Sequence, residues 1–182
     1  MADAPRSAPP EPLLIRIVET LSLGAGVVAA GLIFASVLIT CQMIFVRFVL
    51  NASTIWQTEA VVYMMIGATV IGLPYVQKLR GHVNVDLLPL LLPRPLRNLL
   101  AIVVLVASLG VAALMTWYGW ELFHVAWARN WKSDTVWGVP LWIPYSVVPL
   151  GFALYILQLA ADLFRVRRGE TPFAHGAFEE ES

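Results

Sequence analysis

The chain has 182 residues, of which 59% are hydrophobic and only 13% are charged, whereas soluble domains are about 45–50% apolar. Its 12 basic and 12 acidic residues cancel to a formal net charge of zero, which argues against nucleic-acid binding, since that needs a basic surface. The single cysteine, Cys41, can form no internal disulfide and is interpreted as an apolar packing residue.

Residues 1–12 are rich in proline and charged side chains, so they cannot bury a core and are predicted to be a disordered tail. Long apolar runs follow, approximately Ile17 to Val46, Val61 to Val76, Leu99 to Tyr118 and Leu141 to Leu163. A helix of about 20 apolar residues crosses a bilayer, and a helix bonds its own backbone there. The sequence therefore predicts an all-α integral membrane protein with four transmembrane helices over residues 13–168, and a C-terminal tail over residues 169–182.

The basic residues predict the orientation of these helices. Nine of the 12 fall on the side that holds both termini, and three fall on the other. Because cytoplasmic loops carry the excess of Lys and Arg, both termini are predicted to be cytoplasmic. The tryptophans all flank the opposite, outer loops. They are interpreted as an interfacial aromatic belt, with a docking surface for an outer partner as the alternative.

Charged groups face each other across the first outer connection. Arg47 closes the first run and Glu59 opens the second, so the two are predicted to form an ion pair. Glu59 is also expected in the first turn of its helix, where the helix dipole favours a carboxylate. A contact with a partner protein is the alternative role for this pair.

The segment after the second run is predicted to form a short interfacial helix. Gly81 can end the preceding helix, and Asn84 or Asp86 can cap a new one that continues to Leu92. His82 and Asp86 are four residues apart and would share a helix face, but they have no third member for a metal or acid–base site. No metal, cofactor or enzymatic activity is predicted.

Small residues recur four apart in the runs, a spacing that lets helices pack closely. The pairs are Gly26 with Ala30, Gly31 with Ala35, Ala68 with Gly72, and Ser108 with Ala112. Ionisable residues, which would mark an ion path, are nearly absent from the middle of the runs. This pattern favours a scaffold over an autonomous carrier.

Several motifs resemble one known family. These are Trp56-Gln57-Thr58-Glu59 followed by Gly67, then Arg80-Gly81-His82-Val83-Asn84-Val85-Asp86 with Leu92-Pro93 and Arg97, and finally Gly138-Val139-Pro140-Leu141-Trp142-Ile143-Pro144-Tyr145 leading to Pro149 and Gly151. Together they are similar to the small membrane subunit of tripartite ATP-independent periplasmic (TRAP) transporters, the DctQ-like family. Thr58 departs from the family, which often has a second acid there.

This resemblance implies a subunit of the bacterial inner membrane that braces a large multi-span permease and works with a periplasmic solute-binding protein. Uptake of organic acids such as C4-dicarboxylates would be driven by an ion gradient, typically of sodium. Structural or partner-interface roles are predicted for Arg47, Trp56, Glu59, Gly67, Arg80, Gly81, His82, Asp86, Arg129, Lys132, Asp134, Pro140 and Trp142. The outer segment 130–136 is the preferred contact for the binding protein.

Two other classes remain as alternatives. A membrane anchor of a redox complex would need histidines on facing helices to ligate haem, but His82 and His124 are expected near opposite membrane faces, and His175 lies in the C-terminal tail. A small self-assembling exporter would need a membrane-embedded acid, for which Glu59 is the candidate.

Overall fold

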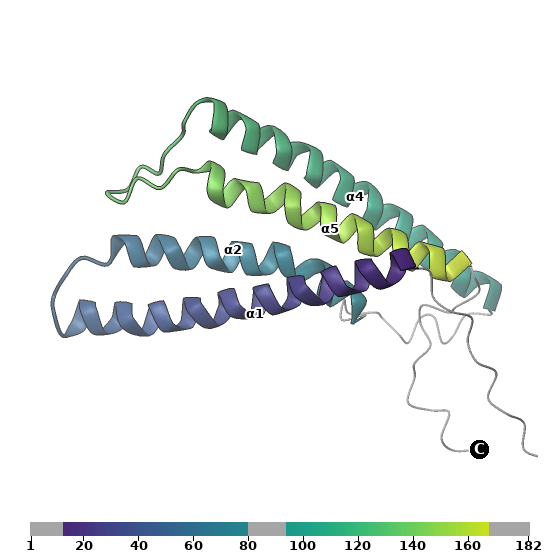
Figure 1. Cartoon of the computed structure of the whole chain (residues 1–182), viewed down its shortest axis with the longest axis horizontal. Coiled ribbons are helices and arrows are strands. Elements are labelled where there is room, and N and C mark those ends of the chain that lie inside the picture. Colours follow the sequence, from purple (N-terminus) through teal and green to yellow (C-terminus); the bar gives the residue numbers. More distant parts are fainter. Residues whose placement is uncertain (1–12, 80–93, 168–182) are drawn as a thin grey trace, which may run out of the picture.

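The structure is a computed structural model that describes residues 13–79 and 94–167. It contains helices α1 (Leu13–Phe48), α2 (Ile55–Lys78), α4 (Arg94–Ala128) and α5 (Trp142–Arg167) (Figure 1). All four are long and apolar enough to cross a membrane, which confirms the predicted all-α membrane fold. The predicted tails and the predicted interfacial helix lie outside the described residues.

The helices are longer than the apolar runs that predicted them. At 1.5 Å per residue, the 36 residues of α1 and the 35 of α4 span about 54 and 52 Å, compared with about 30 Å of hydrocarbon. The third run was predicted to end at Tyr118, but α4 continues to Ala128. Asn130, with a φ of 49°, then turns the chain. The hydropathy of the side chains falls where the helix leaves the hydrocarbon, but the backbone hydrogen bonds of the helix continue. The helix is therefore longer than the apolar run.

The helices form a row in the order α1, α2, α5, α4. Each packs mainly on its neighbour in that row, and the extensive contacts of α4 are all with α5. Figure 1 shows two antiparallel hairpins, α1–α2 and α4–α5, that lie together where α1 begins and α5 ends. The first and last described helices therefore have these ends on the same side, as an even number of spans requires.

Buried residues seven apart, most of them small, form a stripe along α1 and along α4. Over residues 102–128, α4 buries Leu105, Ala112, Gly119 and Ala126, and α1 buries Ile15, Ser22, Ala29 and Ser36 in the same spacing. A seven-residue repeat keeps one stripe facing a neighbour that crosses at about +20°. Among the predicted pairs spaced four apart, only Ala68 and Gly72 are both buried. The prediction was wrong for Gly31, which is exposed and has nothing within 4 Å of the position that a Cβ would take.

Helices α2 and α5 touch through their backbones at Gly151. A Cβ on this residue would lie 2.7 Å from the carbonyl oxygen of Val70. Pro74, four residues after Val70, has no N–H to bond that carbonyl within the helix. The hydrogen of Gly151 that replaces a side chain points at this oxygen, a geometry that favours a Cα–H···O contact. Only glycine allows this approach.

Candidate functional site

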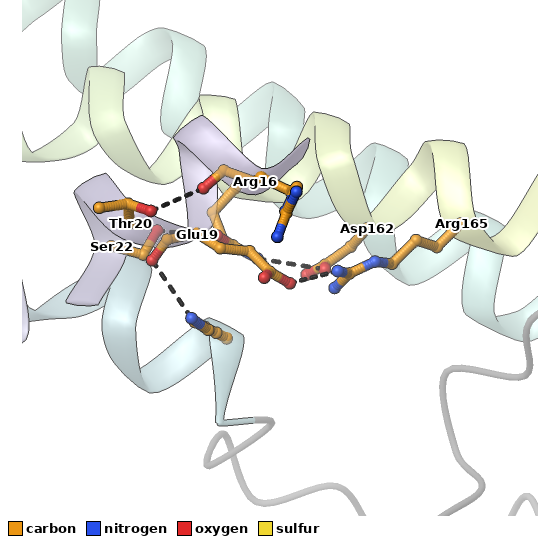
Figure 2. Close-up of polar contacts among 8 residues, drawn as sticks. Arg16, Glu19, Thr20, Ser22, Asp162 and Arg165 are labelled. Carbon is orange, nitrogen blue, oxygen red and sulfur yellow. Dashed lines mark hydrogen bonds and ion pairs between the residues drawn. The ribbon is translucent and has the colours of Figure 1, made fainter. Parts of the chain in front are cut away.

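A polar network joins three helices at the end where α1 begins and α5 ends (Figure 2). Arg165 of α5 forms an ion pair with Glu19 of α1, and both side chains are mostly buried, at 17% and 24% exposed. Lys78 of α2 donates through Nζ to the backbone carbonyl of Glu19 at 3.2 Å. Residues from the first, second and last helices are therefore connected through Glu19, by its carboxylate and by its backbone carbonyl.

The network continues deeper between the same helices. Ser22 donates to Oε1 of Gln158 at 2.7 Å, and Nε2 of Gln158 donates to Asp162 at 3.3 Å. Nε2 of Gln77 donates to the other oxygen of Asp162 at 2.9 Å. Ser22 and Gln158 are almost completely buried. Hydrogen bonds to charged groups contribute about 1.5–3 kcal/mol each, so this network stabilises the packing of α1, α2 and α5 at their predicted cytoplasmic ends.

At the opposite ends of the helices, Glu59 of α2 makes the polar contacts. This carboxylate accepts hydrogen bonds from the Tyr63 hydroxyl at 2.6 Å and from the Thr135 hydroxyl. The predicted ion pair with Arg47 was wrong, because Arg47 is exposed and the carboxylate is bonded by hydroxyls instead. Glu59 also lies beyond the first turn of α2, which contains no acidic residue. Its side chain therefore meets the connection between α4 and α5.

That connection, residues 129–141, is a short hairpin-like turn. Ser133 donates through its backbone N–H to Val139 at 2.9 Å, and Leu141 donates to Trp131 at 2.9 Å. Its polar and aromatic side chains reach back to α2. Trp137 lies edge-on to Trp56 of α2 with ring centroids 6.0 Å apart. Directly after the turn, Trp142, the first residue of α5, lies edge-on to Trp127 of α4 at 4.7 Å.

The residue pattern of this chain matches a known family. The family described as "Tripartite ATP-independent periplasmic transporters, DctQ component" matches residues 36–169. The chain belongs to the DctQ family. A DctQ protein is a transporter component, not an enzyme, and the four apolar helices of this one make it a multi-pass membrane protein.

Curated relatives carry related names. The chain is 25% identical over 157 residues to the C4-dicarboxylate TRAP transporter small permease protein DctQ of Vibrio cholerae, covering 75% of this chain and 68% of the relative. It is 28% identical over 100 residues to the same-named protein of Pseudomonas aeruginosa, covering 54% and 48%. The isethionate TRAP transporter permease protein DctMQ of Oleidesulfovibrio alaskensis is 29% identical over 112 residues, which cover 62% of this chain and 18% of that protein.

The predicted site residues of this DctQ protein fall into separate groups. Trp56 and Glu59 meet the 129–141 turn, on which Pro140 forms an isolated bridge with Lys132. Arg129, Lys132 and Asp134 are exposed on that turn. Gly67 is buried where a Cβ would touch Leu32 of α1 and Val147 of α5. Arg80, Gly81, His82 and Asp86 lie outside the described residues.

The polar network around Glu19 and Asp162 was not predicted from the sequence. No part in such a network was predicted for Glu19, Ser22, Gln77, Gln158 or Asp162. A signal was present, because Gln158, Asp162 and Arg165 follow one another at helical spacing, at the end of the last apolar run and just beyond it. Within residues 13–79 and 94–167 no three His, Cys, Asp or Glu side chains gather as a metal site would require.

Proposed function

We propose that this DctQ protein is the small permease subunit that braces a large permease subunit in the bacterial inner membrane. The complex takes up organic acids such as C4-dicarboxylates, delivered by a periplasmic binding protein and driven by a sodium gradient. The names of the relatives support this substrate class, since they specify C4-dicarboxylates or isethionate, which are organic anions. The name DctMQ supports a permease in which two components act together.

The observation that carries the proposal is the distribution of polar contacts. These contacts lie near the two ends of the helices, around Glu19 and Asp162 at one end and around Glu59 at the other. Between them, α1, α2 and α5 pack through small residues such as Ala29, Gly67 and Gly151. A protein that moved a charged solute through itself would need polar groups near the midplane. An element that holds another protein in position needs stable ends and a tightly packed middle.

Reconstitution in proteoliposomes tests this role. The chain, a large TRAP permease subunit and a periplasmic binding protein from the same organism are combined, and uptake of a labelled dicarboxylate is followed with and without an inward sodium gradient. Uptake is expected only when all three proteins and the gradient are present. Equal uptake without this chain, or uptake by this chain alone, would overturn the proposal.

The turn 129–141 is the proposed contact for the binding protein. Arg129, Lys132 and Asp134 are exposed on it, and Val136 is 93% exposed. Replacing the three charged residues by alanine is expected to reduce uptake at least tenfold while the large permease still co-purifies. Ser53→Ala, which removes an exposed polar side chain on the other outer connection, is the control. Unchanged uptake in the triple variant would show that this turn has no part in delivery.

A further inference from the structure

The turn between α4 and α5 has an ordered tip. Gly138 donates through its backbone N–H to the carbonyl oxygen of Thr135 at 3.0 Å, which closes a four-residue turn over residues 135–138. Gly138 has a φ of 60°, a left-handed conformation that glycine adopts at little cost. The backbone N–H of Thr135 donates to Oγ of Ser133 at 3.3 Å. The tip is therefore shaped by hydrogen bonds within the turn itself.

Contacts with α2 determine where this tip lies. The hydroxyl of Thr135 donates to Oε2 of Glu59, and the ring of Trp137 lies against that of Trp56. Trp56 and Glu59 are three residues apart on α2, so their side chains are neighbours on the helix surface. Figure 1 shows the connection between α4 and α5 running toward the start of α2. Two residues of the tip therefore contact one end of α2, which belongs to the other hairpin.

The carboxylate of Glu59 is itself held by α2. Its Oε1 accepts a hydrogen bond at 2.6 Å from the hydroxyl of Tyr63, four residues further along the helix. This bond leaves Oε2 for Thr135, whose Oγ1 lies 3.0 Å from Oγ of Ser133. One carboxylate therefore connects a side chain of the first hairpin to a pair of hydroxyls on the turn.

Val136 lies between the two tip residues that contact α2. It is 93% exposed, so it makes almost no contact with its own chain. Lys132 and Asp134, on the same turn, are exposed charged residues. An apolar centre with a polar rim is typical of protein–protein contacts. A tip that is ordered before a partner arrives also loses less conformational freedom on binding, which strengthens the complex.

We propose that Glu59 is a positioning residue for solute delivery, which holds Thr135 against α2 and so presents Val136 to an apolar pocket on the periplasmic binding protein. This proposal rests on the proposed function and names the residue that makes the contact and the residue that orders it. Glu59 does not touch the binding protein. Without its carboxylate the turn loses an anchor on α2, so the binding protein must order the turn on arrival and binds more weakly.

Val136→Asp tests the contact itself. Uptake in the reconstituted system is measured against the concentration of binding protein, which separates the half-saturating concentration from the maximal rate. The half-saturating concentration is expected to rise at least about fivefold, as for an interface residue that contributes to binding, with an unchanged maximal rate. Val49→Asp, at an aliphatic residue that is 60% exposed on the other outer connection, is the matched control and is expected to behave as wild type.

Thr135→Val tests the anchor, because it removes the hydroxyl that Glu59 accepts and keeps the size of the side chain. The half-saturating concentration is expected to rise about two- to tenfold, whereas Thr135→Ser retains the hydroxyl and should keep the wild-type value. Glu59→Ala is expected to give a similar rise, and adding Thr135→Val to it should change little, because both remove the same link. Thr58→Val is the matched control, since its exposed hydroxyl donates to the carbonyl of Thr54 at 3.1 Å.

Amide hydrogen exchange measures the order of the turn directly. The backbone N–H groups of Ser133 and Gly138 are bonded within the turn, so peptides that cover residues 131–139 are expected to show protected amides in the wild-type complex. Glu59→Ala and Thr135→Val should reduce this protection, whereas Thr58→Val should not. Each variant is also purified with the large permease, and a wild-type ratio of the two subunits shows that it has folded and assembled.

A wild-type half-saturating concentration in Val136→Asp would overturn the proposal, because the tip would then not touch the binding protein. Wild-type values of half-saturation or of exchange in Glu59→Ala would overturn it as well, because the carboxylate would then not order the turn. A lower maximal rate at an unchanged half-saturating concentration, or loss of the large permease, would assign Glu59 to assembly and refute the proposal. The proposed function would survive each of these results, whereas uptake that does not require this chain would overturn both.

Discussion

Substituting Gly151 by alanine tests the backbone contact between α2 and α5. The new Cβ would lie 2.7 Å from the Val70 carbonyl oxygen and 2.9 Å from its carbon. Carbon–oxygen contacts of this type lie at about 3.3–3.6 Å, so the two helices must separate by about 0.6 Å or more. Overpacking of this kind costs about 1–3 kcal/mol, and the better helix propensity of alanine returns up to about 1 kcal/mol. The net free energy of unfolding is expected to fall by about 1–2 kcal/mol.

Gly31→Ala is the matched control, because it also lies in the middle of a helix but nothing lies within 4 Å of its Cβ position. Alanine there is expected to raise the melting temperature, while Gly151→Ala lowers it by about 2–8 °C. Circular dichroism of the purified subunit in detergent measures both. The new Cβ would also lie 2.6 Å from Cγ1 of Val70. A second variant that adds Val70→Ala removes this side-chain clash but not the backbone clash, so it is expected to restore only part of the loss. Equal stabilisation by both alanines would refute the proposed backbone contact.

Other substitutions test the polar contacts at the two ends of the helices. Arg165→Met should destabilise the subunit by about 3 kcal/mol by leaving Glu19 without its cation, and a double-mutant cycle with Glu19→Gln should show coupling above about 0.5 kcal/mol; additive effects would contradict the ion pair. Gln158→Leu should cost about 1–3 kcal/mol, whereas Gln42→Leu on the exposed face of α1 should change stability by less than about 0.5 kcal/mol. Thr135→Val should lower the melting temperature, because it removes a hydrogen bond to the Glu59 carboxylate, and no change would show that this hydroxyl does not stabilise the 129–141 turn.

The helices could be predicted from the sequence because hydrocarbon imposes two simple demands, apolar side chains and internally bonded backbone. The order of the helices in the row could not. Contacts between helices in lipid depend on small residues, and this chain has many. Gly31 and Gly151 look alike in sequence, but one faces open space and the other faces a backbone carbonyl.

The sequence suggests polar contacts only between residues that lie near one another in the chain, and here that inference failed. The pair of Arg47 with Glu59 was inferred from proximity and was wrong, since the Thr135 hydroxyl, 76 residues from Glu59, reaches the carboxylate instead. The hydrogen bond between Ser22 and Gln158 spans 136 residues, and nothing local in either segment specifies it. Long-range pairs of this kind follow from the packing of the helices and are seen only once that packing is known.

The polar network around Glu19 and Asp162 has a consequence for how the protein is made. Ser22 and Glu19 emerge with the first helix and Gln77 with the second, but Gln158, Asp162 and Arg165 are on the last. Until α5 has inserted, the earlier groups have none of these partners inside the membrane, and α5 itself carries three polar side chains that lipid alone would not accommodate. A truncated product would thus leave these polar groups without partners at the end of the helices where α1 begins. The polar contacts that α5 completes therefore also distinguish a full-length polypeptide from a truncated one.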